Sequence, residues 1–225
     1  MTDEPNHPDA GPKVLVVSLA VVTFVTGMVD AVSFLGLDHV FVGNMTGNVV
    51  FLGFALAGVP EFSGSASLVA LASFLAGAVT AGWLLRHAGR RLFAPFVAGE
   101  AMLCSAATVV AVTAGGTTAR YAMTVLLALA LGVQSAVVRR LGVPDMATTN
   151  VLTTTLTALA ADHPDPGGWG SHAMRRAALV AAMLLGALVG AVLVVHTSTV
   201  WALATAAALL AAVAVVHLAW VPVTE

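Results

Sequence analysis

The chain alternates long apolar runs with short polar breaks. Six of these runs hold at least about 18 residues, enough for a helix to cross about 30 Å of hydrocarbon at about 1.5 Å per residue. The pattern therefore predicts six membrane-spanning helices. Their approximate ranges are 13–37, 67–86, 92–114, 121–138, 176–196 and 201–221.

Two further apolar stretches, 45–58 and 149–161, are shorter. Each holds only about 13 or 14 residues, a length more typical of a segment that enters the membrane and returns than of one that crosses it. If neither stretch crosses, eight of the nine Lys and Arg residues lie on the side of the N-terminus and Arg120 alone lies opposite. Since Lys and Arg accumulate in cytoplasmic loops, this arrangement predicts two re-entrant half-helices and cytoplasmic N- and C-termini.

The two halves of the chain resemble each other weakly but in the same order. Three pairs of segments match: residues 27–32 with 132–137, 42–48 with 143–150, and 74–78 with 183–187. Each half then holds three crossings and one re-entrant stretch, and an odd number of crossings inverts one half relative to the other. Inverted repeats are common in secondary transporters, where the binding site lies between the repeats.

The predicted fold is therefore an all-α integral membrane protein with a single membrane domain. A flexible polar tail over residues 1–12 precedes a first repeat over 13–114 and a second over 121–221. Composition agrees, because 59% of the residues are hydrophobic and only 9% are charged, whereas a soluble domain carries about 25% charged residues. These proportions exclude a soluble globular domain and a disordered chain.

Charge and motif content narrow the function classes. A net charge of −2, with no large cluster of Lys and Arg, predicts no nucleic-acid partner. The single cysteine, Cys104, cannot form an internal disulfide, and the seven His residues form no metal-ligand spacing. We expect no metal and no cofactor. The chain has no G-x-S-x-G, P-loop or H-E-x-x-H motif, so we expect no catalytic residues.

Polar residues precede both short stretches and form the first candidate site. Asn44, Thr46, Gly47 and Asn48 lie at the start of 45–58, and Thr148, Thr149 and Asn150 lie at the start of 149–161. Backbone N–H groups at a helix start lack intrahelical partners, and the helix dipole there favours an anion or a polar oxygen. Either these groups bind a solute, or side-chain caps and neighbouring helices satisfy them.

Two carboxyl groups lie inside predicted spans and form the second candidate set. Asp30 lies in the first span and Glu100 in the third. Such a group costs a few kcal/mol unless it is paired, protonated or hydrated. Either the two residues couple protons, or they are structural. In the structural alternative Asp30 accepts hydrogen bonds from the first re-entrant N-terminus, and Glu100 pairs with an interior donor such as Gln134.

The stretch from Gly27 to Gly53 resembles the YoaK-like family of bacterial membrane proteins, domain of unknown function 1275. The resemblance is strongest in Gly27-x-x-Asp30-Ala31 and in Asn44-Met45-Thr46-Gly47-Asn48. Members often show a Thr-Gly pair in the second motif, where this chain has Thr153-Thr154-Thr155. The resemblance implies a bacterial plasma (inner) membrane location and brings no activity.

These observations together predict a transporter or channel for a small polar or anionic solute. The solute is expected between the two half-helix N-termini, with Asp30 or Glu100 coupling protons. The expected partners are the lipid bilayer and this solute, and the sequence leaves the oligomeric state open. The main alternative is a membrane scaffold that transports nothing, and a membrane-embedded enzyme ranks last.

Overall fold

The computed structural model describes residues 10–88, 93–141, 156–157 and 171–220. Within these ranges every regular element is an α-helix, as the sequence predicts. Six helices are long and apolar enough to cross a membrane, which confirms the six predicted spans. They are α1 (Ala10–Gly36), α3 (Gly64–Ala88), α4 (Phe93–Thr113), α5 (Gly116–Leu141), α7 (Ser171–His196) and α8 (Thr199–Trp220).

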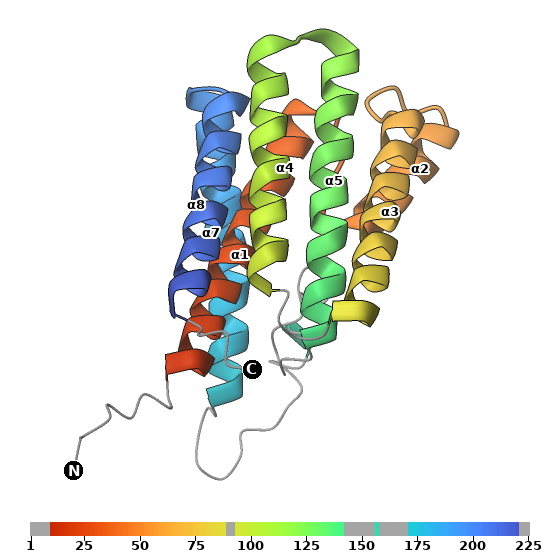
Figure 1. The fold of residues 1–225 in the computed structure, drawn as a ribbon. Helices are drawn as coiled ribbons and strands as arrows, with labels where there is room; N and C mark the ends of the chain where they lie inside the picture. Colours follow the sequence, from red (N-terminus) through yellow and green to blue (C-terminus); the bar gives the residue numbers. More distant parts are fainter. Residues whose placement is uncertain (1–9, 89–92, 142–155, 158–170, 221–225) are drawn as a thin grey trace, which may run out of the picture.

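The six long helices run in alternating directions (Figure 1). Helices α1, α4 and α7 run from the lower end of the view to the upper end, and α3, α5 and α8 run back. The start of α1 and the end of α8 therefore lie at the same end of the bundle. Arg120 lies near the start of α5, at the upper end. The other Arg residues of the described helices lie close to helix ends on the lower side: Arg86, Arg139, Arg140, Arg175 and Arg176.

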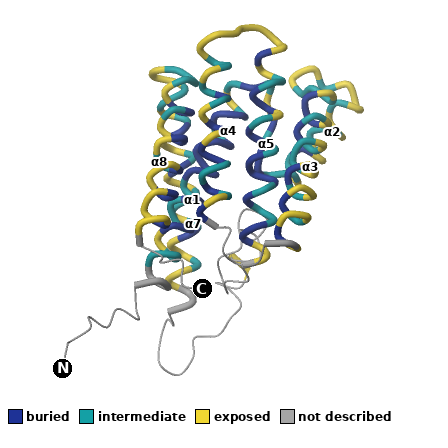
Figure 2. Tube along the Cα trace, in the orientation of Figure 1, coloured by how far each residue is buried: buried dark blue, intermediate teal, exposed yellow. Residues whose placement is uncertain are grey.

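Helices α1 and α5 form the centre of the bundle. In the 18-residue apolar stretch of each of these helices, 56% is buried inside the protein, against 17% in α7. Figure 2 shows the buried residues concentrated on these inner helices and the exposed residues on the outside. Many of the exposed side chains are large and apolar, for example Trp83, Met102 and Trp201. An apolar outer surface is expected where a helix bundle faces lipid.

Glycines bring α1 and α7 into backbone contact. A Cβ placed on Gly186 would clash with the carbonyl oxygen of Phe24, and a Cβ on Gly27 would clash with the carbonyl oxygen of Met183. Neither position can take a larger residue without moving backbone. Small residues allow helices to approach this closely, and packing between them drives helix association in lipid.

Helices α3 and α5 cross in the same way. A Cβ on Gly77 would fall on the carbonyl oxygen of Leu129, and a Cβ on Gly132 would fall on the carbonyl oxygen of Phe74. The α3–α5 and α1–α7 interfaces are the two most extensive in the described bundle. Helices α4 and α8 pack against each other and complete the bundle beside α5 and α1.

One short helix, α2 (Met45–Leu56), lies between α1 and α3 in the chain. After α1 ends, the backbone turns back through Asp38 and His39, which have positive φ angles of 61° and 56°. The chain then passes beside Asp30. This residue lies six positions before the end of α1, which corresponds to about 9 Å along the helix axis. The 12 residues of α2 span about 18 Å and pack against α3. This helix corresponds to the predicted stretch 45–58, whereas most of 149–161 lies outside the described residues.

Candidate functional site

Asp30 holds the backbone segment that precedes α2. Its Oδ1 atom accepts hydrogen bonds from the backbone N–H of Val42 at 3.0 Å and of Gly43 at 2.7 Å. The side chain is buried, with 4% of its surface exposed. Its second oxygen, Oδ2, is buried and has no hydrogen-bond partner among the described residues. The carboxyl group is therefore anchored through Oδ1, whereas Oδ2 is enclosed without a described donor.

Gly43 must be small for this contact to form. A Cβ on Gly43 would lie 3.2 Å from Asp30 Oδ2 and 3.0 Å from Leu131 Cδ1. The segment before α2 is thus enclosed between α1 and the central part of α5. A larger residue here would push the segment away from the carboxyl group that holds it.

Asn48 ties the first turn of α2 to the same segment. Its Oδ1 accepts from the backbone N–H of Phe41 at 2.9 Å, and its Nδ2 donates to the carbonyl oxygen of Phe41 at 2.6 Å. Asn48 is fully buried, and both ends of its amide are used inside the protein. Gly47 faces the Phe41 ring, and a Cβ there would lie 2.7 Å from Phe41 Cδ2.

The remaining residues of the first motif are less enclosed. Asn44 is the N-cap residue of α2, but its side chain makes no capping hydrogen bond. Thr46 is exposed in the first turn. The structure therefore brings Asn44, Gly47 and Asn48 to one turn beside Asp30. The second motif, Thr148, Thr149 and Asn150, lies outside the described residues.

A cluster of aromatic rings surrounds α2. Phe41 stacks on Phe34 and on Phe51, with centroid distances of 5.1 and 5.6 Å, and Phe51 stacks on Phe62 at 4.8 Å. These rings connect the end of α1, the turn and the segment after α2. Sequence reasoning missed them, although five of the nine Phe residues fall between 34 and 62.

A second polar group links three helices at the centre of the bundle. Gln134 on α5 lies between Thr26 on α1 and Glu100 on α4, and all three side chains are buried. The Gln134 amide contacts Thr26 Oγ1 at 2.8 Å and Glu100 Oε1 at 2.5 Å. Thr26 lies one helical turn before Asp30, so both polar residues fall on the same side of α1.

The polar row formed by Thr26, Gln134 and Glu100 has two complete hydrogen-bonding arrangements. With the Gln134 amide nitrogen toward Glu100, the amide donates to an ionised carboxylate and its oxygen accepts from the Thr26 hydroxyl. With the amide reversed, a protonated Glu100 donates to the Gln134 oxygen. The amide nitrogen then donates to Thr26, whose hydroxyl donates to the Val22 carbonyl oxygen at 3.0 Å. Amide orientation is assigned from such networks, and the two arrangements differ in whether Glu100 carries a proton.

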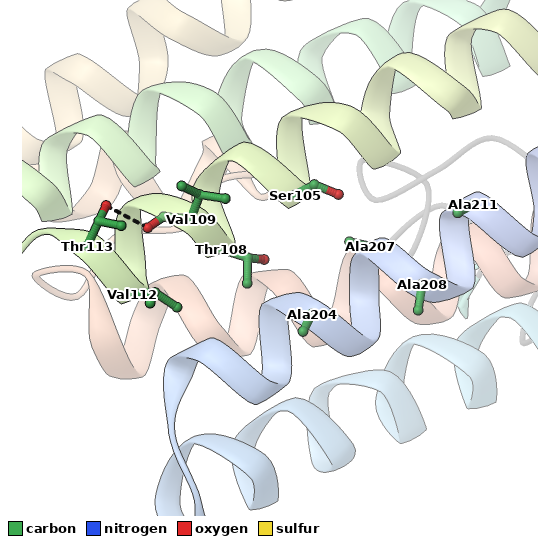
Figure 3. Close-up of a pocket in the computed structure, with 9 residues that line it drawn as sticks. All are labelled: Ser105, Thr108, Val109, Val112, Thr113, Ala204, Ala207, Ala208 and Ala211. Carbon is green, nitrogen blue, oxygen red and sulfur yellow. Dashed lines mark hydrogen bonds between the residues drawn. The ribbon is translucent and has the colours of Figure 1, made fainter.

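A groove of about 630 Å³ lies between α4 and α8. Figure 3 shows its lining, four alanines of α8 facing Ser105, Thr108, Val109, Val112 and Thr113 of α4. The hydroxyl groups of Ser105, Thr108 and Thr113 each donate to the carbonyl four residues earlier at 2.8 Å. The groove therefore presents an apolar surface, and the candidate polar site lies elsewhere, around Asp30 and Glu100.

Comparison with known proteins identifies the family. The family model described as "Protein of unknown function (DUF1275)" matches residues 18–216. The "UPF0700 transmembrane protein YoaK" of Bacillus subtilis (strain 168) is 31% identical over 149 residues, which cover 64% of this chain and 65% of that protein. The match thus spans somewhat less than two thirds of the curated relative. No solved structure matches the chain.

Proposed function

Since this chain belongs to the DUF1275 family of proteins of unknown function and holds six apolar helices of membrane-spanning length, we propose that it is a membrane transporter or channel for a small polar solute. Proton coupling is assigned to Glu100 or Asp30. The observation that carries this proposal is the polar row of Glu100, Gln134 and Thr26, which connects the two sequence halves. Its two hydrogen-bonding arrangements differ by one proton on Glu100, as proton coupling would require.

The helix crossings support an inverted repeat. An offset of 105 residues relates Gly27 to Gly132, and an offset of 109 relates Met183 to Phe74. The contact of Gly27 with the Met183 carbonyl in one crossing thus corresponds to that of Gly132 with the Phe74 carbonyl in the other. The contacts of Gly186 with Phe24 and of Gly77 with Leu129 correspond by the same two offsets.

Most of the helix pairing follows the same exchange, although the smaller α7–α8 contact has no comparable counterpart between α3 and α4 in the described residues. If α1 is equivalent to α5, α3 to α7 and α4 to α8, then the α1–α7 contact maps onto α5–α3 and the α1–α8 contact onto α5–α4. The α4–α8 and α1–α5 contacts map onto themselves. Equivalent helices run in opposite directions (Figure 1). We therefore propose two inverted repeats of three spans each, which places Gln134 of the second repeat between Thr26 and Glu100 of the first.

We also propose that α2 is a re-entrant half-helix. Two features support this: the chain folds back beside α1 as far as Asp30 before α2 begins, and α2 is too short for about 30 Å of hydrocarbon. The equivalent half-helix at 149–161, with Thr148, Thr149 and Asn150 at its start, remains a prediction from the sequence.

The contacts of Asp30 favour a polar solute over an anionic one. The N–H groups of Val42 and Gly43 already donate to its carboxyl group. An anion placed at the start of α2 would meet this carboxyl at close range, and like charges repel strongly where water is scarce. A solute with N–H or O–H groups could instead donate to Oδ2, which is buried and lacks a described hydrogen-bond partner.

The charge at the two ends of the bundle supports an orientation. The Arg residues at the lower helix ends outnumber Arg120 at the upper end, and Lys and Arg favour the cytoplasmic side. We propose a bacterial plasma membrane location with the lower end, where α1 begins and α8 ends, in the cytoplasm.

Flux through proteoliposomes that contain a trapped pH indicator tests the function. Small polar solutes are added outside under an imposed pH gradient, and solute uptake and internal pH are followed together. We expect uptake of at least one solute with coupled proton movement. Asp30→Asn or Glu100→Gln should abolish the proton movement while folding is kept, whereas Ser105→Ala, on the exposed side of α4, should leave it intact. No flux of any solute would favour the scaffold alternative, and unchanged proton movement in both carboxyl variants would refute the coupling role.

A further inference from the structure

Glu100 also lines a second pocket, distinct from the groove between α4 and α8. This pocket lies between α4 and α5 and has a volume of about 290 Å³. Its other lining residues on α4 are Pro95, Phe96, Gly99, Met102 and Leu103, and α5 contributes Ala130 and Val133. Met102 and Pro95 are exposed on the outer surface of the bundle, so the pocket opens toward the surface that faces lipid.

The pocket combines apolar walls with one ionisable group. Glu100 is the single ionisable side chain among its described lining residues, and it is 3% exposed. Its contact within the described residues is the neutral amide of Gln134, which can hydrogen-bond the carboxyl but cannot neutralise it. A carboxylate in such a place needs a proton or a cation.

We propose that this pocket binds an amine that carries a small apolar group. The amine enters from the hydrocarbon side as the neutral base and takes up the proton of the Glu100 carboxyl group. The ammonium group would pair with the Glu100 carboxylate, and the apolar group would lie against Phe96, Leu103 and Val133. A cavity of about 150 Å³ holds a benzene ring, so a volume of about 290 Å³ accommodates one ring with a short aminomethyl arm. A carboxylate of the same shape would be repelled by ionised Glu100, and an alcohol would form no ion pair with it.

This site extends the proposed function to a ligand class, and it is tested by binding, so that it can fail independently of transport. The protein is placed in nanodiscs, and binding of benzylamine, benzyl alcohol and benzoate is compared with binding to empty nanodiscs. The three probes share one ring and differ in charge. We expect saturable binding of benzylamine alone.

The variants locate the site. Glu100→Gln should weaken benzylamine binding at least fivefold, because the charge is lost while a hydrogen-bonding side chain of similar size remains. Ser105→Ala, on the same helix but in the groove between α4 and α8, should change it less than twofold. A diazirine derivative of benzylamine should label the α4 peptide that contains Phe96, Met102 and Leu103, as read by mass spectrometry.

Three outcomes would overturn the proposal. The first is equal binding of benzoate or benzyl alcohol, which would show partition into an apolar gap. The second is a loss of less than fivefold in Glu100→Gln, and the third is an absence of saturable benzylamine binding in the wild type. The comparison of the three probes needs only the wild-type protein, so a folding defect in a variant does not make the proposal untestable.

Discussion

Replacing Asp30 by Ala should release the segment that precedes α2. The wild-type carboxyl group accepts two backbone hydrogen bonds, from Val42 at 3.0 Å and from Gly43 at 2.7 Å. A hydrogen bond to a charged group contributes about 1.5–3 kcal/mol. Loss of both therefore destabilises the closed segment by about 3 kcal/mol even at the lower limit. Since about 1.4 kcal/mol corresponds to a factor of ten, local opening should become on the order of 100-fold more frequent.

Amide hydrogen exchange measures this opening directly. We expect the Val42 and Gly43 amides in nanodisc-embedded Asp30→Ala to exchange on the order of 100-fold faster than in the wild type, because exchange follows the free energy of local opening. Asp30→Asn keeps an acceptor oxygen, so its exchange should rise only several-fold. Amides in the middle of α8 serve as the internal control. Exchange at Val42 and Gly43 within about threefold of the wild type in Asp30→Ala would refute the anchoring role of this carboxyl group.

Three further predictions concern packing and surface contacts, each read from thermal unfolding in detergent. Gly186→Ala should prevent folding or destabilise the fold by about 3 kcal/mol or more, because the new Cβ clashes with the Phe24 carbonyl oxygen. The control Gly82→Ala places its Cβ in open space and should be neutral or slightly stabilising. Asn48→Ala should cost about 2–3 kcal/mol through the loss of two hydrogen bonds to the Phe41 backbone; a smaller loss than about 0.5 kcal/mol would contradict the bidentate pairing. Arg120→Gln breaks the exposed ion pair with Asp38 and should change stability by at most about 1 kcal/mol.

The spans were predictable because hydrophobic length determines them directly. The predicted run 176–196, for example, appears as the candidate span Met174–His196. The start of α2 was also predictable, since Asn44 is a favoured N-cap type and does occupy that position. Boundaries differ by a few residues where a helix continues into a polar stretch, as in α5, which begins at Gly116 and not at the predicted 121.

The partners of the polar residues could be predicted only in part. The sequence predicts Gln134 as an interior donor for Glu100, and the structure brings the two side chains together. Thr26 was missed, since a helical Thr usually donates to a carbonyl one turn back, and Thr26 has such a contact with Val22 as well. Its second contact joins residues 108 positions apart and depends on how α1 and α5 pack. The pairing of Asn48 with Phe41 likewise requires a turn that no local pattern specifies.

The glycine crossings have a consequence for how the chain is synthesised. Helix α1 reaches its close-packed partner α7 only after more than 130 further residues have left the ribosome, which takes on the order of 10 s at about 5–20 residues per second. During that interval the buried carboxyl group of Asp30 would be costly in lipid, but its donors at Val42 and Gly43 follow within 13 residues. The Asp30 carboxyl group can therefore gain these two hydrogen bonds before the second half of the protein has been synthesised.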